Sequence, residues 1–111
     1  MEEGAIVKVS LPESDGKIRS RPALILKRIP PYNDWLMCVI SGGVHNRVDG
    51  LDILIDVKHP DFLSMRLKYP ALIRAGFLFT LSEEKIEGTI GSVGKATLKE
   101  LKKNITDFIS Q

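Results

Sequence analysis

The segment Ser20–Leu26 reads SRPALIL, so that an arginine stands directly before a proline and an apolar run. Pro22 fixes its own backbone angle and favours an extended conformation at Arg21. A guanidinium is permanently charged and carries five N–H donors, which suits the binding of a phosphate. Arg21 is therefore the first candidate for a phosphate-binding residue. An ordinary surface arginine at the start of a strand is the alternative that this segment leaves open.

A second candidate region begins at Ser41, where another apolar run ends. If the strands that carry Arg21 and Ser41 are neighbours, the two side chains face one pocket, and the glycines after Ser41 let a phosphate approach backbone N–H groups. A guanidinium, a hydroxyl and backbone donors stabilise the charge of a phosphoryl transition state without a metal. Two solvated basic loops with no common site remain the alternative. Further candidates for substrate binding in these loops are Lys17, Arg19, Gly42, His45 and Arg47.

Other kinds of chemistry find little support in the sequence. His45 and His59 do not have the spacing of a metal site, and neither a phosphate-binding GxxxxGK[ST] loop nor a G-x-S-x-G motif is present. Cys38 is the only cysteine and lies within the apolar run WLMCVI, so we expect a buried, unreactive thiol. The sequence therefore predicts no metal and no cofactor.

Composition indicates an ordinary globular chain. The 111 residues are 43% apolar and 27% charged, with a net charge of +2, so a polyanion would have to bind to a local patch.

No apolar run approaches the roughly 20 residues that cross a bilayer, and the acidic N-terminus does not resemble a signal peptide. A lone thiol is typical of a reducing compartment. We expect one domain over residues 1–111, located in the cytoplasm and not associated with a membrane.

The candidate residues must be positioned by short strands, because β-rich runs alternate with turn-forming residues along most of the chain. Residues 11–20 and 41–50 are predicted to be polar loops, and the first of them is expected to be mobile. Ser82 is a candidate cap for a helical turn over 83–86. The predicted strands cover 5–10, 22–27, 35–40, 51–57, two short pieces of 72–81 around a turn at Ala75-Gly76, and 89–93.

One helix is predicted, over residues 95–109. Its apolar residues recur at helical spacing and form one stripe that is expected to pack against the sheet. Many short strands followed by a terminal helix favour a mainly β fold, a small barrel with local helices. The stripe consists of Leu98, Leu101, Ile105, Phe108 and Ile109.

The order of these pieces resembles the MazF/PemK toxin family. A glycine-led first strand, a polar loop and RPALVL-like text open the family's pattern, and here the text from Gly4 to Leu26 is GAIVKVSLPESDGKIRSRPALIL. A strand ending in serine or threonine follows, here CVIS. Later landmarks are LKYPALIRAGFLFTL over 67–81 and the pair Ile90-Gly91 before the helix. The similarity covers nearly the whole chain.

The resemblance implies an SH3-like barrel of the MazF/PemK/CcdB toxin type and a homodimer with an RNA groove at its interface. It implies metal-independent cleavage of single-stranded RNA, in which the RNA 2′-hydroxyl attacks and leaves a 2′,3′-cyclic phosphate. Arg21 would stabilise charge and move a proton at the scissile phosphate, and Ser41 would donate a hydrogen bond to it. A cognate antitoxin would lay an acidic, disordered tail over Lys17, Arg19 and Arg21.

The chain also departs from the family pattern. Ala71 stands where the family often has serine, and Gly76 stands near a position that is often polar or acidic. Arg74 is a candidate to point into the groove, and His45 is a candidate to replace the missing acid or base. These departures keep a second class of function open: a non-catalytic binding module, or a toxin that inhibits a DNA topoisomerase, on the same barrel.

Overall fold

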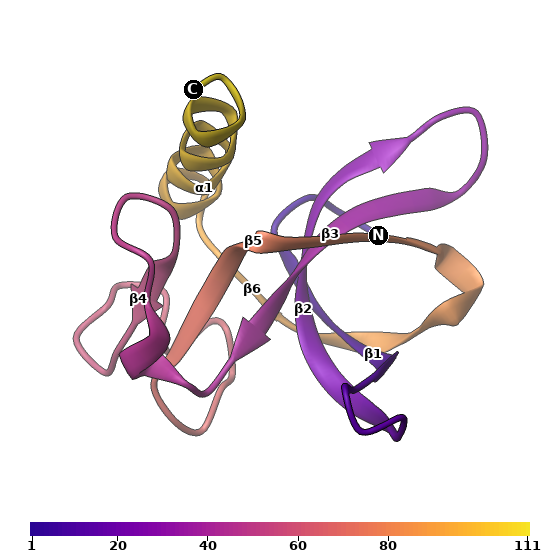
Figure 1. Cartoon of the computed structure of the whole chain (residues 1–111), viewed down its shortest axis with the longest axis horizontal. Helices are drawn as coiled ribbons and strands as arrows, with labels where there is room; N and C mark the ends of the chain where they lie inside the picture. Colours follow the sequence, from indigo (N-terminus) through magenta and orange to yellow (C-terminus); the bar gives the residue numbers. More distant parts are fainter.

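A computed structural model describes all residues, 1–111, and shows one curled antiparallel sheet with a helix against it (Figure 1). The strands lie in the order β4-β5-β3-β2-β1-β6. The expected class, mainly β with a terminal helix, is confirmed. The elements are β1 (Ala5–Pro12), β2 (Ile18–Ile29), β3 (Asp34–Ser41), the 3₁₀ turn η1 (Val44–Asn46), β4 (Ile53–Ile55), β5 (Ala71–Ser82), η2 (Glu83–Lys85), β6 (Ile86–Ser92) and α1 (Lys95–Ile109).

The sheet is buried on both faces, because successive side chains of a strand point to opposite sides. On β1, for example, Ile6 belongs to a cluster beneath α1 and β4, whereas Val7 and Val9 belong to a second cluster. The second cluster is covered by the far half of β5 and by β6, through Phe79 and Ile86. The curl of the sheet thus creates two small cores instead of one.

Strand β5 is one continuous element, so the predicted turn at Ala75-Gly76 is wrong. The pairing with β3 passes from Cys38 opposite Leu78 directly to Val39 opposite Arg74, which leaves three residues of β5 without a partner in the ladder. Such a bulge bends a strand and increases its twist. The small residues that suggest a turn therefore mark the bend at which β5 passes from the first cluster to the second.

The predicted polar loop over 11–20 is also largely wrong. Strand β1 continues to Pro12 and β2 begins at Ile18, and the two strands pair in register up to that point. Leu11 packs against the second cluster and so anchors the hairpin, contrary to the expectation of a mobile polar loop. Only residues 13–17 form the connection.

Several smaller expectations are corrected. The fourth strand is limited to Ile53–Ile55, and Ser82 precedes η2 but makes no side-chain capping bond. Helix α1 has its predicted bounds, but Phe108 and Ile109 in its last turn are exposed, because the helix extends past the edge of the core there.

Cys38 is fully buried, as expected. The chain contains no helix of the length and apolarity that a membrane span requires.

Candidate functional site

The strand register brings Arg21 and Ser41 to the same place on the sheet. Ala23 of β2 pairs with Val39 of β3, and the strands are antiparallel. Arg21 stands two residues before Ala23 on β2, and Ser41 stands two residues after Val39 on β3. Because the strands are antiparallel and side chains alternate between faces, Arg21 and Ser41 lie across from one another on the same face. Val39 also pairs with Arg74 of β5, so a second arginine joins this face from the other side.

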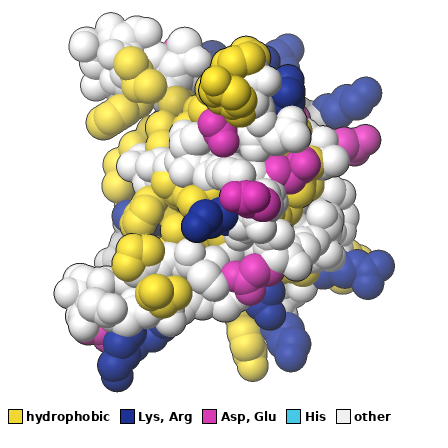
Figure 2. All heavy atoms as spheres, turned by 90° about the vertical axis from the view of Figure 1, so that its right-hand side faces the viewer, with side chains coloured by type: hydrophobic (Ala, Val, Ile, Leu, Met, Phe, Trp, Pro, Cys, Tyr) yellow, Lys and Arg dark blue, Asp and Glu magenta, His cyan; other side chains and the backbone are white.

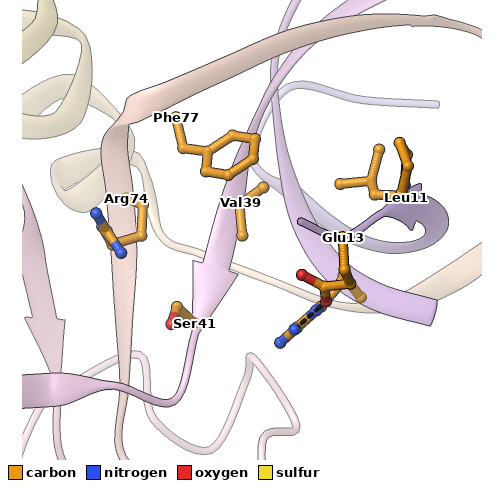
Figure 3. A pocket seen from close by; sticks show the side chains of 8 residues that line it. Leu11, Glu13, Val39, Ser41, Arg74 and Phe77 are labelled. Atoms are coloured by element: carbon orange, nitrogen blue, oxygen red, sulfur yellow. Dashed lines mark hydrogen bonds and ion pairs between the residues drawn. The ribbon is translucent and has the colours of Figure 1, made fainter. Parts of the chain in front are cut away.

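These side chains line a pocket of about 180 Å³, which we call the Arg21 pocket (Figure 3). The figure shows Ser41 and Arg74 on one side, Glu13 and Leu11 on the other, and the Phe77 ring beside Val39. The pocket combines a guanidinium, a hydroxyl and a second cation in a space open to solvent. Its lining consists of Leu11, Pro12, Glu13, Arg21, Val39, Ser41, Arg74 and Phe77.

Arg21 is held by a carboxylate from the hairpin connection. Its Nε donates to Oε1 of Glu13 at 2.8 Å, and Nη2 contacts the same oxygen. No hydrogen bond or ion pair occupies Nη1, and the side chain is 39% exposed. The guanidinium is therefore fixed on one edge, while the N–H groups of the other nitrogen are available to an incoming anion.

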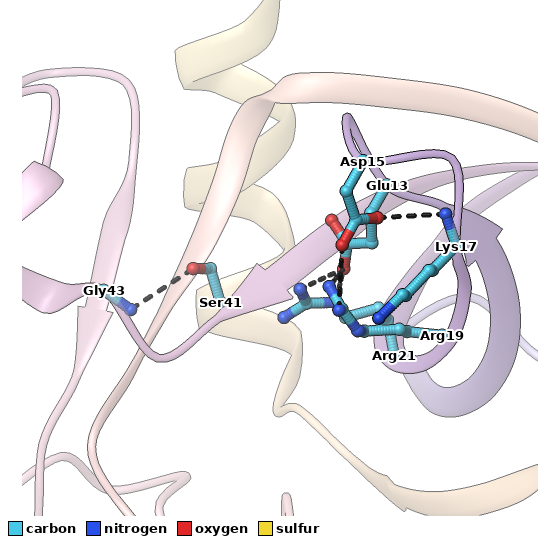
Figure 4. Close-up of polar contacts among 7 residues, drawn as sticks. All are labelled: Glu13, Asp15, Lys17, Arg19, Arg21, Ser41 and Gly43. Carbon is cyan, nitrogen blue, oxygen red and sulfur yellow. Dashed lines mark hydrogen bonds and ion pairs between the residues drawn. The ribbon is translucent and has the colours of Figure 1, made fainter.

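Ser41 ends β3 with its hydroxyl already oriented. The backbone N–H of Gly43 donates to Oγ of Ser41 at 3.2 Å, as Figure 4 shows. Because that lone pair is used, the hydroxyl hydrogen is available to donate elsewhere. A Cβ on Gly43 would lie 3.0 Å from Nδ2 of Asn46, so a side chain there would require the exposed Asn46 side chain to shift.

Arg74 is positioned by a buried carboxylate that the sequence reading did not single out. Its Nε lies 3.5 Å from Oδ2 of Asp52, whose side chain is only 1% exposed. Asp52 also accepts hydrogen bonds from the backbone N–H groups of Ala75 at 3.1 Å and Val48 at 3.0 Å. Asp52 therefore links the bulge of β5 to the segment before β4 and restrains Arg74 at the pocket wall.

The remaining candidates divide into two groups. Arg19 lies at the rim of the Arg21 pocket, where it pairs with Asp15 at 3.0 Å and lies 4.0 Å from Glu13 (Figure 4). Lys17 is exposed on the same hairpin connection. His45 and Arg47 are exposed around η1 and do not line the Arg21 pocket. Nε of Arg47 lies 3.7 Å from Oδ1 of Asp49.

A second pocket of about 200 Å³ lies on the other side of Arg21 and Ser41, and we call it the Tyr69 pocket. It is built by the end of β3 and the segment that leads into β5. Gly42, one of the predicted binding residues, contributes to it. Its lining consists of Arg21, Pro22, Ile40, Ser41, Gly42, Leu67, Lys68, Tyr69, Pro70 and Ala71.

Sequence reasoning missed Glu13, Phe77 and Tyr69. Glu13 stands eight residues before Arg21, a separation that says nothing until the hairpin register is known. An exposed aromatic on a strand is a weak signal by itself, because strands favour aromatics in cores as well.

The hairpin is also less basic than its lysine and arginines suggest. Glu13 and Asp15 offset two of the three positive charges of Lys17, Arg19 and Arg21. Figure 2 shows the face that carries the β2–β3 and β5–β6 turns: acidic side chains cross its middle, and most lysines and arginines project from its edges. On this face, positive charge therefore lies at the edges and does not form one broad basic patch.

The titratable groups outside the pockets suggest no second site. No cluster of three or more His, Cys, Asp or Glu side chains has an arrangement that could hold a metal ion. Burial, with a smaller effect of the Asp52 charge, raises the pKa of Cys38 to about 12, so its thiol stays protonated and unreactive at neutral pH.

Comparison with known protein families identifies the family of this chain. Residues 2–109 match the model of the PemK-like, MazF-like toxins of type II toxin–antitoxin systems. The chain belongs to this family. A search of curated protein sequences gave no match.

Two solved structures of the same fold are similar over nearly their whole length. Toxin MazF-mt6 of Mycobacterium tuberculosis has a TM-score of 0.72 and 19% identity, with 96% of each chain covered. An endoribonuclease solved in complex with its cognate antitoxin, from a mycobacterial species, also has a TM-score of 0.72, with 14% identity and coverage of 99% of this chain and 95% of that one. The family's toxin fold is thus the fold of this chain, as the resemblance in its sequence implied.

Proposed function

We propose that the protein is an endoribonuclease toxin that cleaves single-stranded RNA at the Arg21 pocket. The observation that carries the proposal is the convergence of Arg21, Ser41 and Arg74, from three adjacent strands, on one pocket open to solvent. Two cations and a hydroxyl suit a phosphodiester, whose negative charge grows in the transition state. Family membership, and the endoribonuclease among the structures with the same fold, support this assignment.

The pocket supplies the groups that an attack by the RNA 2′-hydroxyl needs. The 2′-oxygen bonds to phosphorus, the bond from phosphorus to the 5′-oxygen breaks, and a 2′,3′-cyclic phosphate remains. Nη1 of Arg21 and the Ser41 hydroxyl donate to the non-bridging oxygens. Arginine is a poor proton carrier because its pKa is very high, so we assign the 2′-hydroxyl proton to Glu13, the only carboxylate that lines the pocket. The departing 5′-oxygen takes a proton from water.

The proposal extends to partners and location. The toxin acts in the cytoplasm as a homodimer and is neutralised by a cognate antitoxin. An acidic tail of that antitoxin competes with RNA for Lys17, Arg19 and Arg21, because one set of cations does not hold two polyanions at once. Asp15 pairs with Arg19 and so competes with either ligand, whereas the Glu13–Arg21 pair leaves Nη1 of Arg21 available to it.

The test is a cleavage assay on a long single-stranded RNA in the presence of EDTA, with the product ends identified by mass spectrometry. We expect discrete fragments that carry a 2′,3′-cyclic phosphate and a 5′-hydroxyl. Binding of the RNA without cleavage would instead support a non-catalytic binding module. A requirement for a divalent metal would contradict the assigned roles of Arg21, Ser41 and Glu13.

A further inference from the structure

The Arg21 and Tyr69 pockets share Arg21 and Ser41, so these two residues lie between them. Each pocket has one prominently exposed aromatic side chain. Phe77 in the first is 51% exposed, and Tyr69 in the second is 77% exposed. An apolar ring kept in water at the wall of a cationic pocket calls for a ligand that has both a charged and a flat apolar part.

We propose that Phe77 and Tyr69 are stacking platforms for the two bases that flank the phosphate bound at Arg21 and Ser41. This inference rests on the proposed function and adds to it the residues that hold the nucleotides on either side of the scissile bond. Stacking of a base on an aromatic ring stabilises single-stranded nucleic acid with little dependence on sequence, because every base has a π-face.

The orientation of Phe77 is fixed by its surroundings. It lies at the end of the β5 bulge, which carries it out of the ladder next to Val39 (Figure 3). Its ring meets that of Phe79 edge to face, with centroids 6.5 Å apart and an interplanar angle of 87°. Phe79 in turn packs against the second core cluster. The platform is therefore supported from behind before any ligand arrives, which reduces the entropy lost on binding.

Tyr69, on the other side, is positioned by its backbone. Pro70 follows it and favours an extended backbone at Tyr69, and β5 begins at the next residue. Ser41 and Leu72 form the last pair between β3 and β5, so the segment that holds Tyr69 lies beyond the end of this pairing. The pocket contains Arg21 and Lys68 and no carboxylate, so its charge suits the phosphate of the following nucleotide.

Both platforms require bases that are free of a double helix. A base paired in an A-form duplex does not offer its face to a protein side chain, whereas an unpaired base does. Two stacking sites around one phosphate therefore explain a preference for single strands without base-edge contacts. Arg74 beside Phe77 adds a cation near the first nucleotide.

The experiment uses an uncleavable probe, so that binding is measured whether or not the protein cleaves RNA. The probe is a fully 2′-O-methylated heptauridylate with a fluorescent 5′ end, titrated by anisotropy at fixed salt. We expect Phe77→Ala and Tyr69→Ala each to raise Kd by about 5- to 150-fold, the range observed when a stacked aromatic is removed. Phe77→Trp should bind the probe with a Kd close to that of the wild type, because an aromatic ring is kept at this position.

The chain offers matched controls of the same residue types and similar exposure. Phe108→Ala and Tyr32→Ala, at residues that are 53% and 73% exposed, should leave Kd unchanged. A version of the probe with 5-iodouracil bases should photo-crosslink to Phe77 and Tyr69 and not to the control positions. Circular dichroism of each variant checks that it is folded.

The outcomes separate this inference from the proposed function. Normal RNA cleavage with unchanged Kd in both aromatic variants would overturn the stacking sites and leave the nuclease intact. Weakened probe binding by the aromatic variants, together with no cleavage of ordinary RNA by the wild type, would overturn the nuclease and keep the stacking sites. If Phe77→Ala and Tyr69→Ala lost binding to an acidic peptide but still bound the probe, the two rings would belong to a protein-binding site, and the inference would be contradicted.

Discussion

Glu13 and Arg21 form an ion pair across the β1–β2 hairpin, with Nε of Arg21 donating to Oε1 of Glu13 at 2.8 Å. The pair fixes one edge of the guanidinium and leaves Nη1 toward the pocket. It also places a carboxylate next to the site where a phosphate is proposed to bind. One contact therefore has two opposite effects on RNA: it repels the phosphate and positions the group that binds it.

Replacing Glu13 should separate those two effects. In Glu13→Gln the repulsion is lost, so we expect KM for RNA to fall. The acceptor for the 2′-hydroxyl proton is also lost, so kcat should fall by about 100-fold or more. Asp15→Asn is the control for kcat, because Asp15 pairs with Arg19 at the rim and does not line the pocket. An unchanged kcat in Glu13→Gln would remove Glu13 from the reaction.

Asp52 should be important for both stability and positioning. Asp52→Asn removes a buried charge that Arg74 faces and places an amide where the Val48 N–H now donates. We expect a loss of about 2–4 kcal/mol in the free energy of unfolding, measured in urea. Asp49→Asn should change it by less than about 0.5 kcal/mol, because that side chain is 96% exposed. Equal stability of the two variants would contradict the role of Asp52.

Gly91 should tolerate no side chain. A Cβ there would lie 2.3 Å from the backbone oxygen of Ser64, which β6 approaches closely. Gly91→Ala should therefore lower the free energy of unfolding by at least about 2 kcal/mol. Gly42 offers the comparison, since nothing lies within 4 Å of a Cβ at that position. A urea midpoint for Gly91→Ala equal to that of Gly42→Ala would show that β6 is not packed in this way.

The buried thiol predicts a dependence of stability on pH. The pKa of Cys38 is about 12 in the folded chain and about 8.5 when unfolded. Between these values the unfolded chain loses this proton while the native chain keeps it, so stability falls as pH rises from about 8.5 towards 12. Urea titrations should show a shallower decline in Cys38→Ala over this range. Rapid reaction of the native thiol with a thiol reagent at pH 8 would contradict its burial.

Local patterns in the sequence were sufficient to predict the strand-rich class and the helix. Helix α1 has its predicted bounds because its apolar residues recur at the helical period. Its end was less predictable, since the exposure of Phe108 depends on where the core stops and not on the period of the helix. The small residues Ala75 and Gly76 are compatible with a turn and with a bulge, and only the pairing of β5 with β3 distinguishes the two.

The site was predictable only in part for a related reason. Arg21 and Ser41 were found because each stands at the end of a recognisable strand. Glu13, Asp52 and Phe77 belong to the same site through register and through a bulge, and neither is encoded in local spacing. Conversely, His45 is a candidate acid or base by residue type, but it lies outside both pockets.

The most direct test compares two arginines of one strand. Arg21 lines the pocket, whereas Arg28 is exposed near the other end of β2, where its Nη2 donates to Oδ1 of Asn33 at 3.2 Å. On the same single-stranded RNA, Arg21→Ala should cleave about 100- to 1,000-fold more slowly than the wild type, because a preorganised donor to the transition state is lost. Arg28→Ala should cleave at the wild-type rate. A folded Arg21→Ala variant that cleaves as fast as Arg28→Ala would contradict the assignment of this pocket as the cleavage site.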